Sequence, residues 1–147
     1  MPPWWAEFSA KYAASLRTIT LRSNAFTAVP NFSMCGKLVE LCLNGNELME
    51  LSSAGLPPSL TRLDVVNNEL VRIEAELLSS LTKLVRLDVT GNLLTTAALE
   101  GMAGAFGRCK TLEVLDLSCN RLDAVPTGVL DATSLLELRL NMNPLGR

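Results

Sequence analysis

Histidine is absent from this 147-residue sequence, and aromatic residues are scarce, with four phenylalanines, two tryptophans and one tyrosine. Without histidine the chain cannot form a Ser-His-Asp or Cys-His catalytic arrangement, a histidine-ligated zinc site or an imidazole general base. These absences exclude many hydrolase and metalloenzyme mechanisms. We therefore expect no enzyme activity, no catalytic residue, no cofactor and no metal site.

Basic residues are too few and too dispersed to indicate nucleic-acid binding. The 13 lysines and arginines are outnumbered by 15 aspartates and glutamates, which gives a net charge of -2. The sequence contains no run of basic residues that could contact successive phosphates of a nucleic-acid backbone. We therefore predict no contact with nucleic acid.

Signals for export and membrane insertion are also missing. The first eight residues lack a basic segment followed by an apolar run, so they do not resemble a secretory signal. The uncharged stretches are too short or too polar to span a bilayer. The four cysteines show no CxxC pairing, which is typical of a reducing compartment. The expectation is a cytoplasmic protein without membrane insertion.

Leucine is the residue in excess, with 29 of the 147 positions. The leucines follow an eleven-residue pattern, LxxLxLxxNxL, which can be aligned six times, starting at residues 16, 38, 60, 84, 112 and 135. Every copy contains its asparagine. These asparagines are Asn24, Asn46, Asn68, Asn92, Asn120 and Asn143.

This pattern resembles the leucine-rich repeat family, from residue 16 to residue 145. The alternation in its LxL portion places those side chains on one face of a short strand. The resemblance implies an α/β solenoid: a right-handed superhelix with a short parallel β-sheet on its concave face and mixed 3₁₀, extended and helical convex segments. The asparagines would donate to backbone carbonyls and form a structural ladder between stacked repeats.

The chain divides into two predicted parts. Residues 1–15 form an amphipathic capping helix, because Trp5, Phe8 and Tyr12 share one helical face. An alternative is that these aromatics form an exposed docking handle. Residues 16–147 form the leucine-rich repeat domain, whose last repeat is incomplete. We expect its C-terminal edge to be covered by further repeats or by a neighbouring protein.

The 28-residue repeat that starts at residue 84 differs from the others. Its Leu99, Met102, Ala103 and Phe106 fall at helical spacing, which predicts an α-helix over residues 96–107. This repeat resembles the ribonuclease-inhibitor class, whereas its neighbours resemble the shorter intracellular classes. The family type that we expect is therefore a mixed, intracellular one.

The cysteines have separate predicted environments. Cys35 and Cys109 share one column of the repeat, where we expect a small buried core position. Cys42 should face the concave surface, and Cys119 lies just past a strand three repeats later. This separation is on the order of 14 Å, too far for a disulfide.

The residues between the inward-facing leucines should line the concave side, where the family usually binds partners. The predicted partner-binding residues are Glu40, Arg62, Asp64, Val66, Arg86, Asp88, Thr90, Val114, Asp116, Ser118, Glu137 and Arg139. Three aspartates stack along neighbouring strands, with arginines two residues before two of them. One interpretation is a lattice of exposed ion pairs, each worth about 0–1 kcal/mol. The other is a docking stripe for a partner that carries arginine or lysine.

The resemblance implies a protein–protein interaction module with a scaffold, adaptor or regulatory role, whose partner the sequence does not identify. One alternative is the substrate-targeting arm of a larger enzyme, because residues 55–63 (GLPPSLTRL) are similar to repeats that precede bacterial ubiquitin ligase domains. Another is a structural subunit of a cytoskeletal, axonemal or ribonucleoprotein assembly.

Overall fold

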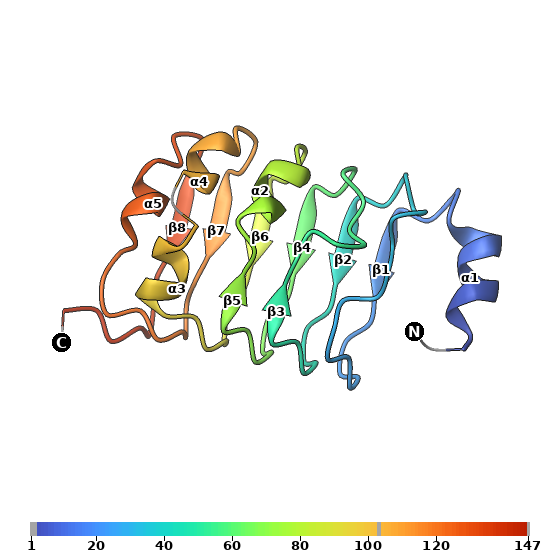
Figure 1. The fold of residues 1–147 in the computed structure, drawn as a ribbon, viewed down its shortest axis with the longest axis horizontal. Helices are drawn as coiled ribbons and strands as arrows, with labels where there is room; N and C mark the ends of the chain where they lie inside the picture. The colour runs from blue at the N-terminus through green and yellow to red at the C-terminus, as the bar shows by residue number, and fades with distance from the viewer. Residues whose placement is uncertain (1–2, 103, 147) are drawn as a thin grey trace.

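Six short parallel strands lie side by side in a solenoid, one strand to each coil (Figure 1). The computed structural model describes residues 3–102 and 104–146. The sheet order follows the chain: β1 (Thr18–Thr20), β2 (Glu40–Cys42), β4 (Arg62–Asp64), β6 (Arg86–Asp88), β7 (Val114–Asp116) and β8 (Glu137–Arg139). The predicted leucine-rich-repeat solenoid with a parallel sheet on its concave side is confirmed.

The register of the sheet aligns one inward-facing apolar residue from every strand. Leu41 pairs with Ile19 on one side and with Leu63 on the other, and the same row continues to Leu138. The middle residues of β2, β4, β6 and β7 are at most 1% exposed. Each such burial stabilises the fold by about 1.5–3 kcal/mol relative to an exposed side chain, so neighbouring coils depend on one another.

The asparagine of each inner repeat links its own coil to the preceding one. Nδ2 of Asn92 donates to the carbonyl oxygens of Val65 and Val89, at 2.9 Å each, and its Oδ1 accepts the Leu70 amide at 2.9 Å. Asn24, in the first coil, is exposed and donates only within its own coil, to Leu21 and Arg22. The inner asparagines therefore satisfy buried backbone groups that would otherwise be orphaned.

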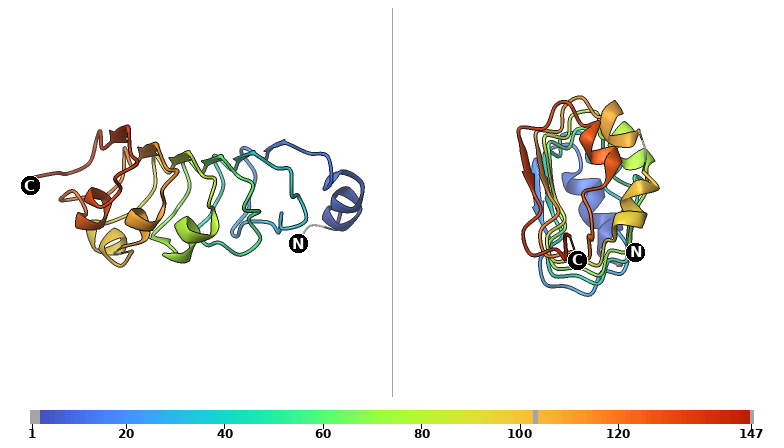
Figure 2. Two further views of the ribbon diagram at one scale, coloured as in Figure 1. Left: turned by 90° about the horizontal axis from the view of Figure 1, so that it is seen from above. Right: turned by 90° about the vertical axis from the view of Figure 1, so that its left-hand side faces the viewer.

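The convex side changes in structure along the chain. Towards the N-terminus it holds a two-stranded sheet, β3 (Glu50–Leu51) and β5 (Arg72–Ile73). Towards the C-terminus the described residues of this side form the short helices α2 (Glu76–Ser80), α3 (Thr96–Glu100), α4 (Ala105–Arg108) and α5 (Thr127–Leu130). Figure 2 shows these helices on the side opposite the six-stranded sheet.

The prediction of one continuous helix over residues 96–107 is wrong. The segment forms α3 and α4 instead, and Gly104 between them has a φ of +77°, in the left-handed region. Glycine adopts this conformation without a steric penalty, and it is a poor helix former. Leu99, Met102 and Phe106 are all buried, so their spacing predicted the buried face correctly. Ala103 lies outside the described residues.

The N-terminal helix α1 (Trp5–Tyr12) lies beyond β1 at one end of the solenoid (Figure 1). Trp5 is 3% exposed, and its ring meets the buried Phe32 ring edge-on at 4.8 Å between centroids. Phe8 is partly buried, whereas Tyr12 is 39% exposed. The helix therefore contacts the first coil mainly through Trp5 and Phe8. None of the described helices is both long enough and apolar enough to cross a bilayer.

Candidate interaction surface

The sheet face is the surface made by the first and third residues of each strand and the residue two positions beyond the strand. Strand register aligns the first residues in one row, so that Glu40, Arg62 and Arg86 are neighbours, followed by Val114 and Glu137. The third residues form the next row, which contains the aspartates. The structure therefore brings the predicted partner-binding residues together on one surface.

The three aspartates of this face are buried, contrary to the expectation of exposed ion pairs. Asp64, Asp88 and Asp116 are 5%, 9% and 6% exposed. Oδ1 of Asp88 accepts the amide of Thr90 at 3.1 Å, and Oδ1 of Asp116 accepts the amide of Ser118 at 3.0 Å. These two carboxylates hold the chain as it leaves the strand, which makes their role structural.

Hydrogen bonding keeps the Asp116 carboxylate ionised. Burial by itself would raise the pKa of Asp116, but hydrogen bonds from Ser118 and Arg139 outweigh that effect and lower the pKa. Ser118 is itself only 6% exposed. The side chains of Ser118 and the three aspartates therefore lie beneath the surface, and direct contact between them and a partner stays a prediction.

Arginines form the outer layer above these carboxylates. Arg62 contacts Asp64 at 2.9 Å and Arg86 contacts Asp88 at 2.8 Å, as the sequence predicted. Arg139 lies 3.3 Å from Asp116 across neighbouring strands. Side-chain exposures of 47%, 25% and 40% leave all three arginine side chains partly accessible. A partner would therefore meet arginines whose positions are set by buried carboxylates.

Asp64 differs from the other two aspartates in its hydrogen bonding. The Val66 amide, two residues later, donates to Oδ1 of Asn44 at 2.8 Å instead of to Asp64. Oδ1 of Asp64 and Nε of Arg86 are buried without a hydrogen-bond partner among the described residues, 3.9 Å from each other. Among the three aspartates, hydrogen bonding to the carboxylate is thus least complete at the N-terminal one, Asp64.

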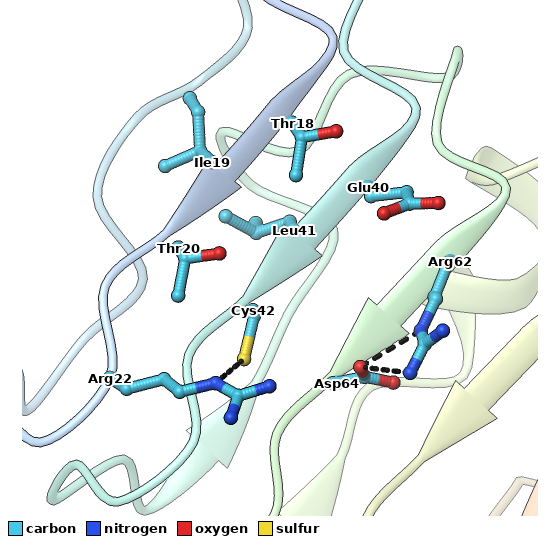
Figure 3. A pocket seen from close by; sticks show the side chains of 9 residues that line it. All are labelled: Thr18, Ile19, Thr20, Arg22, Glu40, Leu41, Cys42, Arg62 and Asp64. Carbon is cyan, nitrogen blue, oxygen red and sulfur yellow. Dashed lines mark hydrogen bonds and ion pairs between the residues drawn. The ribbon is translucent and has the colours of Figure 1, made fainter.

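A cavity of about 170 Å³ lies at this N-terminal end of the sheet face, between β1, β2 and β4 (Figure 3). Its lining consists of Thr18, Ile19, Thr20, Arg22, Glu40, Leu41, Cys42, Arg62 and Asp64. Nε of Arg22 donates to Sγ of Cys42 at 3.1 Å. Threonine and cysteine here occupy the row that aspartates fill in the next three coils.

The sequence-based site omitted most of this cavity. Thr18, Thr20, Arg22 and Cys42 are absent from the predicted partner-binding residues, although Cys42 was expected to face the concave side. The available signal was the change from aspartate to threonine and cysteine within one row of the repeat. This change removes the carboxylate next to an arginine, and so alters the charge available to a partner.

The other cysteines lie where the repeat pattern placed them. Cys35 and Cys109 are 0% and 4% exposed within the core, and burial raises the pKa of the Cys35 thiol. All four cysteines are free thiols. Within residues 3–102 and 104–146, no three or more cysteine, aspartate or glutamate side chains are grouped to hold a metal ion.

Comparison with known proteins agrees with this fold. A family model described as "Leucine Rich repeat" matches residues 108–125. Human podocan-like protein 1 is 34% identical over 131 residues, which cover 86% of this chain and 25% of that protein. The chain therefore spans about a quarter of the length of this relative.

Solved structures give the same result. A Leptospira interrogans LRR protein superimposes with a TM-score of 0.68 at 27% identity, over 84% of this chain and 31% of that chain. An octameric complex of latrophilin 3, Unc5D and FLRT2 (LRR) contains a chain with a TM-score of 0.63 at 22% identity, over 86% of this chain and 54% of that one. With six copies of the repeat pattern stacked in one solenoid, the chain is a leucine-rich repeat protein.

Proposed function

We propose that this chain is a protein-binding module that engages its partner on the sheet face. The observation that carries the proposal is the fixed outer layer of that face: Arg62, Arg86 and Arg139 are accessible, and each is held by a buried aspartate. Side chains that are already ordered lose little conformational entropy when a partner binds. A leucine-rich repeat chain of similar fold is part of the octameric complex with latrophilin 3 and Unc5D, which supports the same proposal.

The accessible part of the predicted site is smaller than the sequence suggested. It comprises Glu40, Arg62, Val66, Arg86, Thr90, Val114, Glu137 and Arg139. Val66 and Val114 are its apolar members, and both are half-buried. Because interfaces gain most from a desolvated centre, we propose that the partner packs on these two valines while its acidic groups meet the arginines.

A scaffold, adaptor or regulatory role without enzyme activity is part of this proposal. The sequence has no histidine, and an open sheet does not exclude water from a reacting group. We also propose a cytoplasmic location and an intracellular repeat type. The four free thiols support both, whereas the comparisons lend them no support.

A second candidate function is that of a structural subunit docked through the C-terminal edge. Leu136 and Met142 are 82% and 83% exposed, and Leu138 of the outermost strand β8 is 36% exposed. Large exposed apolar side chains next to an unpaired strand edge are features of surfaces that another chain covers. This candidate uses a different surface from the sheet face, so the two can be separated by experiment.

Affinity capture with surface variants tests the main proposal. Val66→Asp and Val114→Asp each place a charge on the sheet face, whereas Val71→Asp places one on an exposed valine beside β5. We expect the first two to reduce capture of the native partner at least tenfold and the third to leave it unchanged. Equal capture by all three folded variants would contradict binding on the sheet face.

A further inference from the structure

Two charged side chains of the sheet face lack a partner of opposite charge. Of the nine charged residues on this face, seven take part in ion pairs within 4 Å. The other two are Arg22 and Glu40, for which the part of the chain that the structure describes provides no such pair. Both line the N-terminal cavity, so the two charges without an ion pair lie in one place, with Arg62 on the strand next to Glu40.

The guanidinium of Arg22 has donors to spare. Its Nε donates to the sulfur of Cys42 at 3.1 Å, and sulfur is a weak acceptor. A guanidinium carries five N–H donors in a planar fork that matches a carboxylate. Thr20 and Cys42 share a row of the sheet with Asp64, Asp88 and Asp116, so the next three coils each have an aspartate where the first two have threonine and cysteine. Arg22 therefore lies next to a position where a carboxylate is missing.

Glu40 adds the opposite charge at a defined distance. It precedes Cys42 by two residues on β2, and a strand rises about 3.3 Å per residue, so the two side chains are roughly 6–7 Å apart along the strand. Figure 3 shows Cys42 between Glu40 and the Arg22 guanidinium. Because the Arg22 guanidinium lies against the Cys42 sulfur, the cavity presents a cation beside one residue of β2 and an anion on the residue two positions earlier.

We propose that the N-terminal cavity binds a short extended segment of the protein partner that carries an acidic residue and, two residues away, a lysine or arginine. The acidic side chain meets Arg22 in place of the missing aspartate, and the basic one meets Glu40. Thr18 and Thr20, on the neighbouring strand, line the same cavity. This inference rests on the proposed function, because it specifies the partner's chemistry at one end of the sheet face.

Charge complementarity separates this occupant from simpler ones. A phosphate or a polyanionic segment would be attracted by Arg22 but repelled by Glu40. A polycation would be attracted by Glu40 but repelled by Arg22. A segment with both charges at alternate positions satisfies both groups at once. Salt bridges at such an accessible site are individually weak, so we expect this cavity to contribute specificity more than affinity.

The test is an NMR titration of the intact 147-residue chain with blocked peptides. The probe is acetyl-Ala-Asp-Ala-Lys-Ala-amide together with the same peptide in reversed order. The controls are acetyl-Ala-Asn-Ala-Gln-Ala-amide and inorganic phosphate. We expect at least one charged peptide to shift the Arg22 Nε–H signal and the Thr20 and Cys42 amides saturably, at least tenfold more tightly than either control.

Variants identify the groups responsible. Arg22→Gln and Glu40→Gln should each weaken the charged peptide at least fivefold, whereas Lys83→Gln, at an exposed residue between α2 and β6, should not. Unperturbed amide signals elsewhere would establish that each variant is folded. No saturable shift, equal binding of phosphate, or full binding by Arg22→Gln would overturn the inference. If the peptides fail while capture still depends on Val66 and Val114, only this inference fails and the proposed function stands.

Discussion

Oδ1 of Asn44 accepts the Val66 amide at 2.8 Å, and this bond removes the backbone donor that Asp64 would otherwise have. The equivalent amides, of Thr90 and Ser118, donate to the aspartates of their own coils. Because of this one asparagine, Asp64 at the N-terminal end of the row has an oxygen without a hydrogen-bond partner in the described part of the chain, whereas Asp88 and Asp116 each accept a backbone amide. The predictions that follow begin with this difference.

Removing Asp116 should destabilise the fold more than removing Asp64. Asp116→Ala leaves the buried Ser118 amide without its acceptor, which we expect to cost about 1–3 kcal/mol in the free energy of unfolding. Asp64→Ala removes no backbone hydrogen bond and also removes an unpartnered oxygen. Urea unfolding of both variants would measure the order. Equal losses, or the reverse order, would contradict the structural role given to Asp116.

Acid should reveal the role of Asp116 as well. Its pKa is lowered in the folded state, so the stability that it contributes is present above the pKa of the unfolded chain and is lost as the pH falls through the folded pKa. The free energy of unfolding should therefore decline below about pH 4, and less steeply in Asp116→Asn. Unfolding curves between pH 2 and 6 provide the measurement. An identical slope in the variant would show that other carboxylates account for the decline.

The asparagine ladder predicts unequal effects inside the solenoid and at its N-terminal end. Asn92→Ala leaves the buried carbonyls of Val65 and Val89 and the Leu70 amide without this partner, so we expect a loss of at least about 2 kcal/mol. Asn24→Ala removes two bonds at an exposed site and should cost less than about 0.5 kcal/mol. Thermal or urea unfolding of the pair measures the contrast, and similar losses would argue against stacking between coils as the source of stability.

The break between α3 and α4 makes a prediction about glycine. Gly104→Ala forces a side chain into the left-handed region, which costs about 1–2 kcal/mol. The matched control is Gly36→Ala, whose added methyl group meets no atom within 4 Å and whose φ is not positive. Denaturant unfolding should separate the two variants. A neutral Gly104→Ala would mean that the segment tolerates a continuous helix after all.

The sequence predicted the solenoid well because its period is a direct physical signal. The apolar residues of the LxL portion in the four inner repeats are buried where alternation placed them, and the pairing of Arg62 and Arg86 with aspartates was also anticipated. The sequence predicted one continuous helix over residues 96–107, and this was wrong. Apolar spacing indicates which face of a segment is buried, but it does not indicate the positive φ at Gly104 that interrupts the helix.

The candidate site was only partly predictable. Alternation assigns Asp88 to the outward side of its strand, but it does not reveal that the carboxylate folds back onto the Thr90 amide and becomes buried. The cavity at Arg22 depends on contacts between coils about 20 residues apart, such as the bond from Arg22 to Cys42. These relationships follow from side-chain geometry between neighbouring coils, which the repeat pattern alone does not specify.

Photo-crosslinking from single positions tests the central claim most directly. A benzoylphenylalanine would replace Thr90 on the sheet face, Val71 beside β5 or Leu136 at the C-terminal edge, and the native partner would be identified by mass spectrometry. Binding on the sheet face predicts a dominant crosslinked partner from position 90 and little from positions 71 and 136. Crosslinks from position 136 alone, or equal yields from all three positions, would contradict it.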